Sequence, residues 1–171
     1  MVDRSLSVLY NTYRKVIVAP NIEECMPRVL GNVRHQLDDK NRMRVPAKFR
    51  EGLGSSLVML PGRTGCLYIV PETNIDTMYD KYESDMYFDD AGSDFTTTIF
   101  GNAIDLVEDS QGRVTLDKNV KEKYGIKKEI VFVGKVKYLE VWPAESWDAR
   151  YGVLDPDKLS KMLENLKKRG V

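Results

Sequence analysis

Two short charged segments of the chain share the same arrangement of an aspartate and an arginine. LDDKNRMRVP, residues 37–46, contains Asp38 and Arg42, and EDSQGRVTLD, residues 108–117, contains Asp109 and Arg113. An aspartate at the start of a tight turn accepts backbone N–H bonds across that turn. A guanidinium presents a planar set of donors that fits phosphate oxygens and the O6/N7 edge of guanine. The spacing therefore indicates a turn shaped by its carboxylate, which could carry an arginine to nucleic acid.

The same pattern also has a purely structural interpretation, in which each arginine pairs with its own aspartate. An exposed pair of this kind contributes about 0–1 kcal/mol to stability. The two interpretations are compatible, because the aspartate could also orient the guanidinium. In the functional interpretation the candidate DNA-binding residues are Lys40, Arg42, Arg44, Gln111 and Arg113. The candidate turn-shaping residues are Asp38, Asn41, Asp109 and Gly112.

The two turns belong to a longer internal repeat. Val33 aligns with Ile104 and Gly54 with Gly125, and after one extra residue in the first copy Pro71 aligns with Pro143. Each copy predicts a strand, a four-residue turn ending in a residue that tolerates positive φ, a second strand, a short helix and a β-hairpin. Units this small cannot bury their apolar faces alone, so we expect one shared core.

The repeat divides the chain into five predicted segments. Residues 32–79 form the first unit and residues 103–146 the second. Residues 80–102 between them predict an acidic linker, with a loop over 82–94, followed by a short helix around FTTTIFGNA. Residues 155–169 predict an amphipathic helix whose apolar stripe packs on the core or on a neighbouring subunit. Residues 1–25 form an N-terminal extension outside the repeat.

Charge alternates along a chain whose formal net charge is zero. Residues 27–50 contain seven Lys or Arg against two acids, and residues 118–137 contain the same balance. Residues 72–109 contain eleven acids and a single Lys. A charge run is usually just a solvated face. Two basic runs at equivalent places in a repeat favour a shared basic surface.

Other function classes find little support. The acids of the middle segment lack a nucleophile, a metal cluster or a phosphate-binding loop beside them, so we predict no enzyme and no cofactor. His35 is the single histidine, which disfavours a zinc site, and it falls on the inward side of its strand. Cys25 and Cys66 suggest no disulfide framework, which favours a cytoplasmic protein. GRTG, residues 62–65, predicts a hairpin turn and not an RNA-binding loop.

The two turns, together with the LYIVP and LEVWP segments that follow them, resemble the two motifs of the MraZ family of bacterial transcriptional regulators. The resemblance covers residues 26 to the C-terminal helix. It implies an α+β, mainly β fold, a double-split β-barrel built from two SpoVT/AbrB-like swapped-hairpin units. It also implies ring-shaped homo-oligomers that bind double-stranded DNA at promoter repeats, repress their own division and cell-wall operon, and associate with the nucleoid.

The chain departs from the family pattern in three places. Asn41 stands where the family usually has Gly, and Asp117 stands where the first unit has Pro46. Threonines in residues 93–103 stand where relatives tend to have basic residues.

The alternative function is an AbrB-like protein-interaction module, such as an antitoxin or an assembly scaffold, without direct base readout. In that case the acidic segment or the C-terminal helix would be the binding surface.

Overall fold

The computed structural model describes residues 28–86, 89–153 and 155–169. The first copy of the repeat forms β1 (Val29–Gln36), β2 (Arg42–Met43), α2 (Ala47–Leu53), β3 (Leu57–Pro61), β4 (Leu67–Pro71) and α3 (Ile75–Met86). After α4 (Asp90–Phe100), the second copy forms β5 (Ile104–Asp105), β6 (Val114–Thr115), α5 (Lys118–Lys123), β7 (Glu129–Val136), β8 (Leu139–Pro143) and α6 (Ala144–Tyr151). Helix α7 (Pro156–Lys167) follows. Short 3-10 turns at Arg63–Gly65 and Glu72–Asn74 complete the first copy.

The two copies exchange their first strands. β1 pairs antiparallel with β7 of the second copy, from Val29 opposite Val136 to Gln36 opposite Glu129. β5 in turn pairs with β3 of the first copy. The resulting antiparallel sheet has the order β1-β7-β8-β4-β3-β5, and β2 pairs with β6 in a separate two-stranded ribbon. Neither copy could therefore form its sheet alone.

The main core draws on both copies, as the repeat predicts. Phe49 and Leu53 of α2 pack in one cluster with Phe132 of β7 and Val114 of β6. The predicted hairpins β3–β4 and β7–β8 are confirmed, and GRTG forms the turn between β3 and β4. Asp117 caps α5 by accepting from the backbone N–H groups of Asn119 and Val120.

The fold is mixed α/β, with a large antiparallel sheet and several short helices, so helix is more prominent than a mainly β fold implies. Within the described part of the chain the strand pairings give an open sheet with β1 and β5 at its edges, not a closed barrel. Every helix among the described residues is too short or too polar to cross a bilayer.

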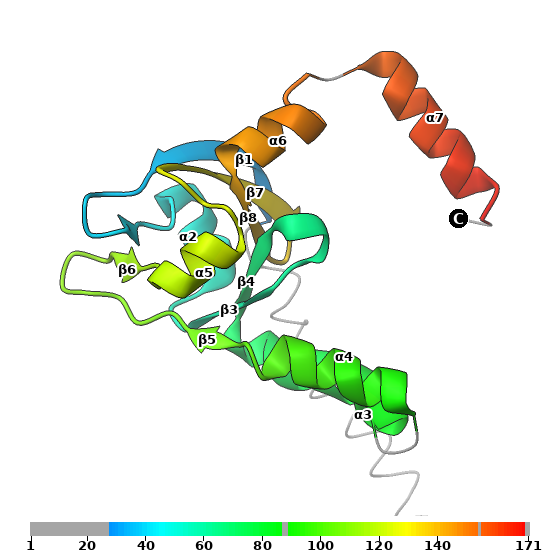
Figure 1. The fold of residues 1–171 in the computed structure, drawn as a ribbon, viewed down its shortest axis with the longest axis horizontal. Coiled ribbons are helices and arrows are strands. Elements are labelled where there is room, and N and C mark those ends of the chain that lie inside the picture. Colours follow the sequence, from blue (N-terminus) through cyan, green and yellow to red (C-terminus); the bar gives the residue numbers. More distant parts are fainter. Residues whose placement is uncertain (1–27, 87–88, 154, 170–171) are drawn as a thin grey trace, which may run out of the picture.

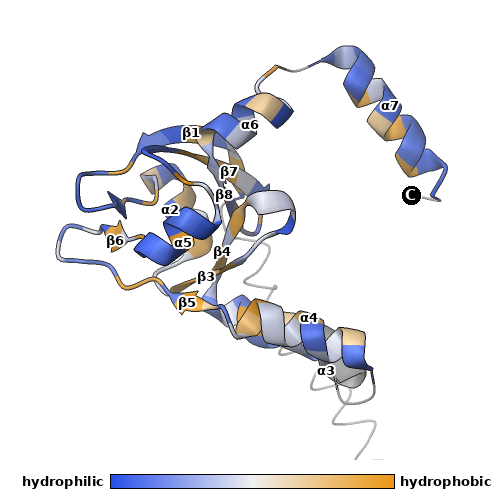
Figure 2. Cartoon of the chain, in the orientation of Figure 1, coloured by the Kyte–Doolittle hydropathy of each residue, from blue (hydrophilic) through white to orange (hydrophobic). Residues whose placement is uncertain are grey.

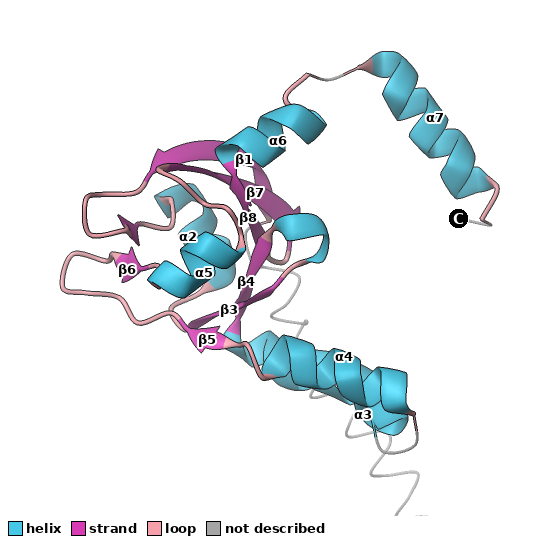
Figure 3. Ribbon diagram, in the orientation of Figure 1, coloured by secondary structure: helices cyan, strands magenta, loops and turns pink. Residues whose placement is uncertain are grey.

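The loop predicted over residues 82–94 is wrong for residues 82–86 and 90–94. Helix α3 continues to Met86 and α4 begins at Asp90, so the acidic segment is a helical hairpin that projects from the body of the molecule (Figure 3). Asp89 lies within the predicted loop, and it caps α4 by accepting from the Gly92 backbone N–H. The predicted short helix therefore exists but starts earlier, and Tyr87 and Phe88 lie outside the described residues.

The C-terminal helix is confirmed as α7, with Asp155 as its N-cap and Pro156 in its first turn. It lies apart from the sheet and from the other helices (Figure 1). Its apolar stripe consequently does not pack on the core that the described residues form, which was one of the two predicted locations. The N-terminal extension predicted over residues 1–25 lies outside the described residues.

Candidate nucleic-acid interface

The first turn is built around the carboxylate of Asp38. Its Oδ1 accepts from the backbone N–H groups of Lys40 and Arg42, both at 2.9 Å. Its Oδ2 accepts from Arg42 Nε at 2.7 Å and lies 2.7 Å from Arg42 Nη2. The carboxylate therefore fixes both the backbone of the turn and the plane of the guanidinium.

The second turn repeats this geometry around Asp109. Oδ1 accepts from the backbone N–H groups of Gln111 at 2.8 Å and Arg113 at 3.0 Å. Oδ2 accepts from Arg113 Nε at 2.8 Å and lies 2.8 Å from Arg113 Nη2. The last turn residues, Asn41 and Gly112, have φ values of 56° and 70°, the left-handed conformation that their types predict.

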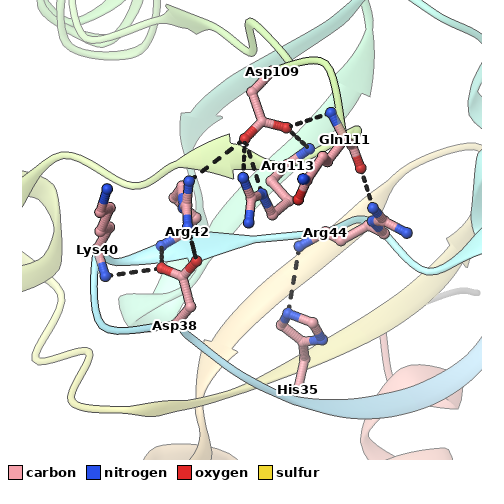
Figure 4. Close-up of polar contacts among 8 residues, drawn as sticks. All are labelled: His35, Asp38, Lys40, Arg42, Arg44, Asp109, Gln111 and Arg113. Atoms are coloured by element: carbon pink, nitrogen blue, oxygen red, sulfur yellow. Dashed lines mark hydrogen bonds and ion pairs between the residues drawn. The ribbon is translucent and has the colours of Figure 1, made fainter.

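The ribbon of β2 and β6 brings the two turns together (Figure 4). Arg42 Nη1 lies 3.7 Å from Asp109 Oδ2, so the first arginine faces the aspartates of both turns. The Arg44 guanidinium donates to the Gln111 backbone carbonyl. All the predicted site residues thus belong to one pair of adjacent turns, although they come from segments about seventy residues apart in the sequence.

Each turn is also tied to the helix of the other copy. Lys121 of α5 donates through Nζ to Asn41 Oδ1 at 2.6 Å. Arg50 of α2 forms an ion pair with Glu108, with Nη2 and Oε2 2.7 Å apart. The helix of the second copy thus holds the first turn, and the helix of the first copy holds the second turn.

The aspartates that shape the turns are held in their charged form. Hydrogen bonds from the Arg113 side chain and backbone lower the pKa of Asp109 to about 2. The Arg42 backbone N–H is the largest cause of the lowered pKa of Asp38, with further bonds from the Arg42 side chain and the Lys40 backbone. Both turns therefore keep their carboxylate charge through the whole neutral range.

The exposed cations of the site are not the arginines of the repeated motif. The side chains of Arg42 and Arg113 are only 22% and 28% exposed. Lys40, Arg44 and Gln111 are exposed at the surface. An open groove of about 560 Å³ runs beside the turns and is lined by residues that include Arg44, Arg50, Glu108 and Gln111. The motif arginines thus shape the turns, while their neighbours present charge and hydrogen-bonding groups to solvent.

Comparison with known proteins gives two matches along the chain to one family model. The model of the MraZ protein, described as antitoxin-like, matches residues 29–96 and again residues 99–169. The chain belongs to the MraZ family. The transcriptional regulator MraZ of Clostridium beijerinckii is 34% identical over 138 residues, which cover 80% of this chain and 97% of the relative. The transcriptional regulator MraZ of Desulforamulus reducens is 32% identical over 137 residues, 80% of this chain and 96% of the relative.

His35 of β1 contacts the segment that follows the first turn, in agreement with its predicted inward position. Its Nε2 accepts from the Arg44 backbone N–H at 3.3 Å, and its ring centroid lies 5.9 Å from that of Phe132. Partial burial lowers the pKa of His35. The neutral imidazole is the form that can accept this bond, so His35 acts as a structural support just after the end of β2.

Sequence reasoning missed Arg50, Glu108 and Lys121 as partners of the turns. A signal was available for two of them, because Arg50 and Lys121 occupy equivalent positions of the repeat, each in the helix after a turn. Glu108 has no acidic equivalent in the first copy, where Leu37 stands, so the repeat could not indicate it.

Proposed function

We propose that this chain is a transcription regulator that binds double-stranded DNA through its two paired turns. The observation that carries the proposal is the placement of both turns side by side, with Lys40, Arg44 and Gln111 exposed next to the two aspartate–arginine pairs. The names of the relatives, transcriptional regulator MraZ, support the same function. Nothing in this function calls for an enzymatic step.

Within the site, each residue has a different proposed role. Asp38 and Asp109 hold the turns and orient the arginines. Lys40 and Arg44 neutralise phosphates and fix the register on the duplex, as cations at a protein–DNA interface commonly do. Gln111 and the partly exposed guanidinium groups of Arg42 and Arg113 meet base edges, since guanidinium and amide groups pair with guanine and adenine in the major groove.

One chain alone offers only weak attraction to DNA. Residues 38–44 and 108–113 together contain four cations and four carboxylates, so the turns carry no excess positive charge. Long-range attraction of a polyanion needs such an excess. We therefore infer that binding is multivalent, because linking several weak sites on one assembly raises the apparent affinity by about 10²–10⁴-fold.

The finer details of the proposal follow the family. The chain would assemble as a homo-oligomeric ring and bind repeated sequences in the promoter of its own division and cell-wall operon, which it would repress. It would work in the cytoplasm on the nucleoid. The two units would complete a double-split β-barrel, for which the exchanged strands β1 and β5 and the β2–β6 ribbon are supporting features.

A gel-shift assay tests the proposal. The native protein should retard the DNA upstream of its own gene, but not a shuffled fragment of the same length. Arg42→Ala should weaken this binding strongly while the circular dichroism spectrum and the assembly mass stay the same. Equal retardation of both fragments, or unchanged binding by Arg42→Ala, would count against base-specific recognition through the turns.

The exposed stripe of α7 favours a second candidate, a protein-interaction module such as an antitoxin or a scaffold. The family model's description as antitoxin-like points the same way. Affinity purification that yields a stable complex with a different protein, together with no retardation of the upstream DNA, would favour this function over DNA binding.

A further inference from the structure

The two copies of the repeat differ at the point where a strand contacts the segment after its turn. His35 of β1 accepts through Nε2 from the Arg44 backbone N–H, with the two nitrogen atoms 3.3 Å apart (Figure 4). The equivalent residues of the second copy are Leu106 and Thr115, and a leucine side chain has no atom that accepts a hydrogen bond. Only the first copy can therefore form this bond.

The bond lies where the β2–β6 ribbon ends. The pairing between these strands ends at Met43, and Arg44 is the next residue. Met43 and Val45 are buried, so the backbone is anchored in the core on either side of Arg44, whose own side chain is exposed. His35 consequently binds the backbone at the first position beyond the ribbon.

Arg44 is the residue through which this bond can affect DNA. Its guanidinium donates to the Gln111 backbone carbonyl of the second turn, and it lines the open groove beside the turns. Figure 2 shows the first turn as hydrophilic throughout, whereas the second turn contains residues of intermediate hydropathy. His35 thus holds the backbone from which an exposed cation of the more hydrophilic turn projects.

His35 is itself held in place by packing. It is partly buried on β1, opposite Ile130 of β7, and its ring centroid lies 5.9 Å from that of Phe132. A side chain that is already fixed by packing loses little conformational entropy when a ligand binds. The imidazole is therefore a rigid acceptor for the Arg44 backbone.

We propose that His35 is a positioning residue for DNA recognition. Its neutral imidazole holds the Arg44 backbone so that the guanidinium of Arg44 meets a phosphate of the bound duplex. The inference rests on the proposed function, because it concerns a cation that the proposed function assigns to phosphate contact.

Protonation of His35 would remove the acceptor. A charged imidazole carries N–H groups on both ring nitrogens, so it cannot accept from the Arg44 backbone. Burial lowers the pKa of His35 below its ordinary value of 6.5, which keeps the accepting form at neutral pH. Specific DNA binding should therefore weaken as the pH falls below 6.5 and through the lowered pKa of His35.

Other charged groups do not set this pH dependence. The elements packed around His35 carry the charged side chains Arg34 of β1, Glu129 and Lys135 of β7, Arg42 of β2, Arg44 after it, and Lys48, Arg50 and Glu51 of α2. None of them contributes to lowering the pKa of His35, because the cause is burial. His35 is the single histidine of the chain, so no other side chain has its ordinary pKa in the range where the imidazole titrates.

Two substitutions at position 35 separate the hydrogen bond from the packing. His35→Gln keeps an acceptor, since the amide oxygen can take the place of Nε2, and it does not titrate. It should bind the upstream DNA within about 2-fold of the native affinity at neutral pH. His35→Phe keeps a ring against Phe132 without an acceptor, and loss of the hydrogen bond should weaken binding at least about 5-fold. Equal affinities of the two variants would overturn the proposal.

An Arg44→Ala background identifies the route of the effect. Because His35 acts through Arg44, His35→Phe should cause less than about a 2-fold further loss in the Arg44→Ala chain. A full additional loss would mean that His35 affects DNA binding by another route, and the proposal would be wrong. Circular dichroism and the melting temperature show whether each variant is folded. Where His35→Phe does not fold, the pH comparison of native chain and His35→Gln decides.

The pH profile separates positioning from a merely structural role. Fluorescence anisotropy measures the affinity for the upstream DNA from about pH 8 down to the pH at which NMR shows His35 to be protonated. The native affinity should fall with its midpoint at the measured pKa of His35, whereas that of His35→Gln should stay constant within about 2-fold. Affinity for a shuffled fragment should not fall, because protonation adds a positive charge. Identical profiles for the two chains, at pH values where the native imidazole is protonated, would overturn the proposal.

Failure of DNA binding itself gives a different result. A native chain that does not distinguish the upstream DNA from the shuffled fragment contradicts the proposed function. A native chain that does distinguish them, with equal affinities for the His35→Gln and His35→Phe variants, contradicts the role of His35 alone.

Discussion

The two turns have the same hydrogen-bond geometry and different surface chemistry. In both, one carboxylate binds two backbone N–H groups and one arginine, with matching distances within about 0.1 Å. The exposed positions differ, since Lys40 and Arg44 of the first turn correspond to Gln111 and Thr115 of the second. The shared part shapes the turn, and the part that differs gives the first turn most of its positive charge.

The arginines of the motif differ in a further way. Arg42 lies near the carboxylates of both turns, whereas Arg113 pairs with Asp109 of its own turn. Removal of Arg42 should therefore disturb both turns, and removal of Arg113 mainly one.

The largest expected effect follows from this difference. Arg42→Ala should weaken binding to the upstream DNA by about 100-fold, or about 2.7 kcal/mol, and Arg113→Ala by about 10-fold. Fluorescence anisotropy with labelled DNA measures both affinities. The assembly mass of each variant is the control, and a larger loss for Arg113→Ala would contradict the unequal roles.

Acid should loosen both turns. Because the pKa of Asp109 is lowered to about 2 in the folded chain, its stabilising contribution is complete above the unfolded-state pKa of about 3.9. That contribution is lost as the pH falls from about 4 to about 2. Carboxyl carbon chemical shifts in an NMR titration should give the lowered pKa directly. The stability of Asp109→Asn should depend less on pH in this window, and an equal dependence would contradict the assigned hydrogen bonds.

The contact of the second turn with α2 should have a measurable effect on stability. Glu108→Gln removes the ion pair between Glu108 and Arg50. The side chains of Glu108 and Arg50 are 28% and 27% exposed, so the substitution should lower the free energy of unfolding by about 0.5–1 kcal/mol. The matched control is Glu122→Gln, whose ion pair with Lys118 is far more exposed and should contribute less than about 0.3 kcal/mol. Urea denaturation distinguishes the two values.

The smallest effect should come from exchanging the left-handed residues of the two turns. Gly112→Asn should cost less than about 0.5 kcal/mol, because Asn tolerates positive φ and a Cβ at this position meets nothing within 4 Å. Asn41→Gly keeps the conformation but loses the hydrogen bond from Lys121, which should lower the free energy of unfolding by ~0.3 kcal/mol. Gly112→Val should cost more than either, and a smaller cost for valine would contradict the left-handed assignment.

Local features of the fold were predictable from the sequence, but long-range pairing was not. The positive φ of Asn41 and Gly112, the cap at Asp117 and the β3–β4 and β7–β8 hairpins follow from residue types over short spans. The exchange of β1 and β5 could not be predicted from periodicity, which marks a strand but does not name its partner. The contact of Arg42 with Asp109 depends on the same long-range pairing.

The acidic segment shows why composition can mislead. Its many Asp, Ser and Gly residues favoured a loop, yet Asp89 and Asp90 lie at the start of α4, where carboxylates are favourable. Ile75, Met78 and Tyr79 already have the spacing of one helix face. That spacing was the better predictor.

The most direct test compares the first turn with the second in one DNA-binding experiment. Lys40→Ala/Arg44→Ala removes the exposed cations of the first turn, and Gln111→Ala/Thr115→Ala changes the equivalent positions of the second. Anisotropy titrations with the upstream DNA over a range of salt concentrations should show at least about a 10-fold loss and a shallower salt dependence for the first variant. The second variant should lose less than about 3-fold and keep the native salt dependence. Equal losses, or no loss in the first variant, would contradict the account.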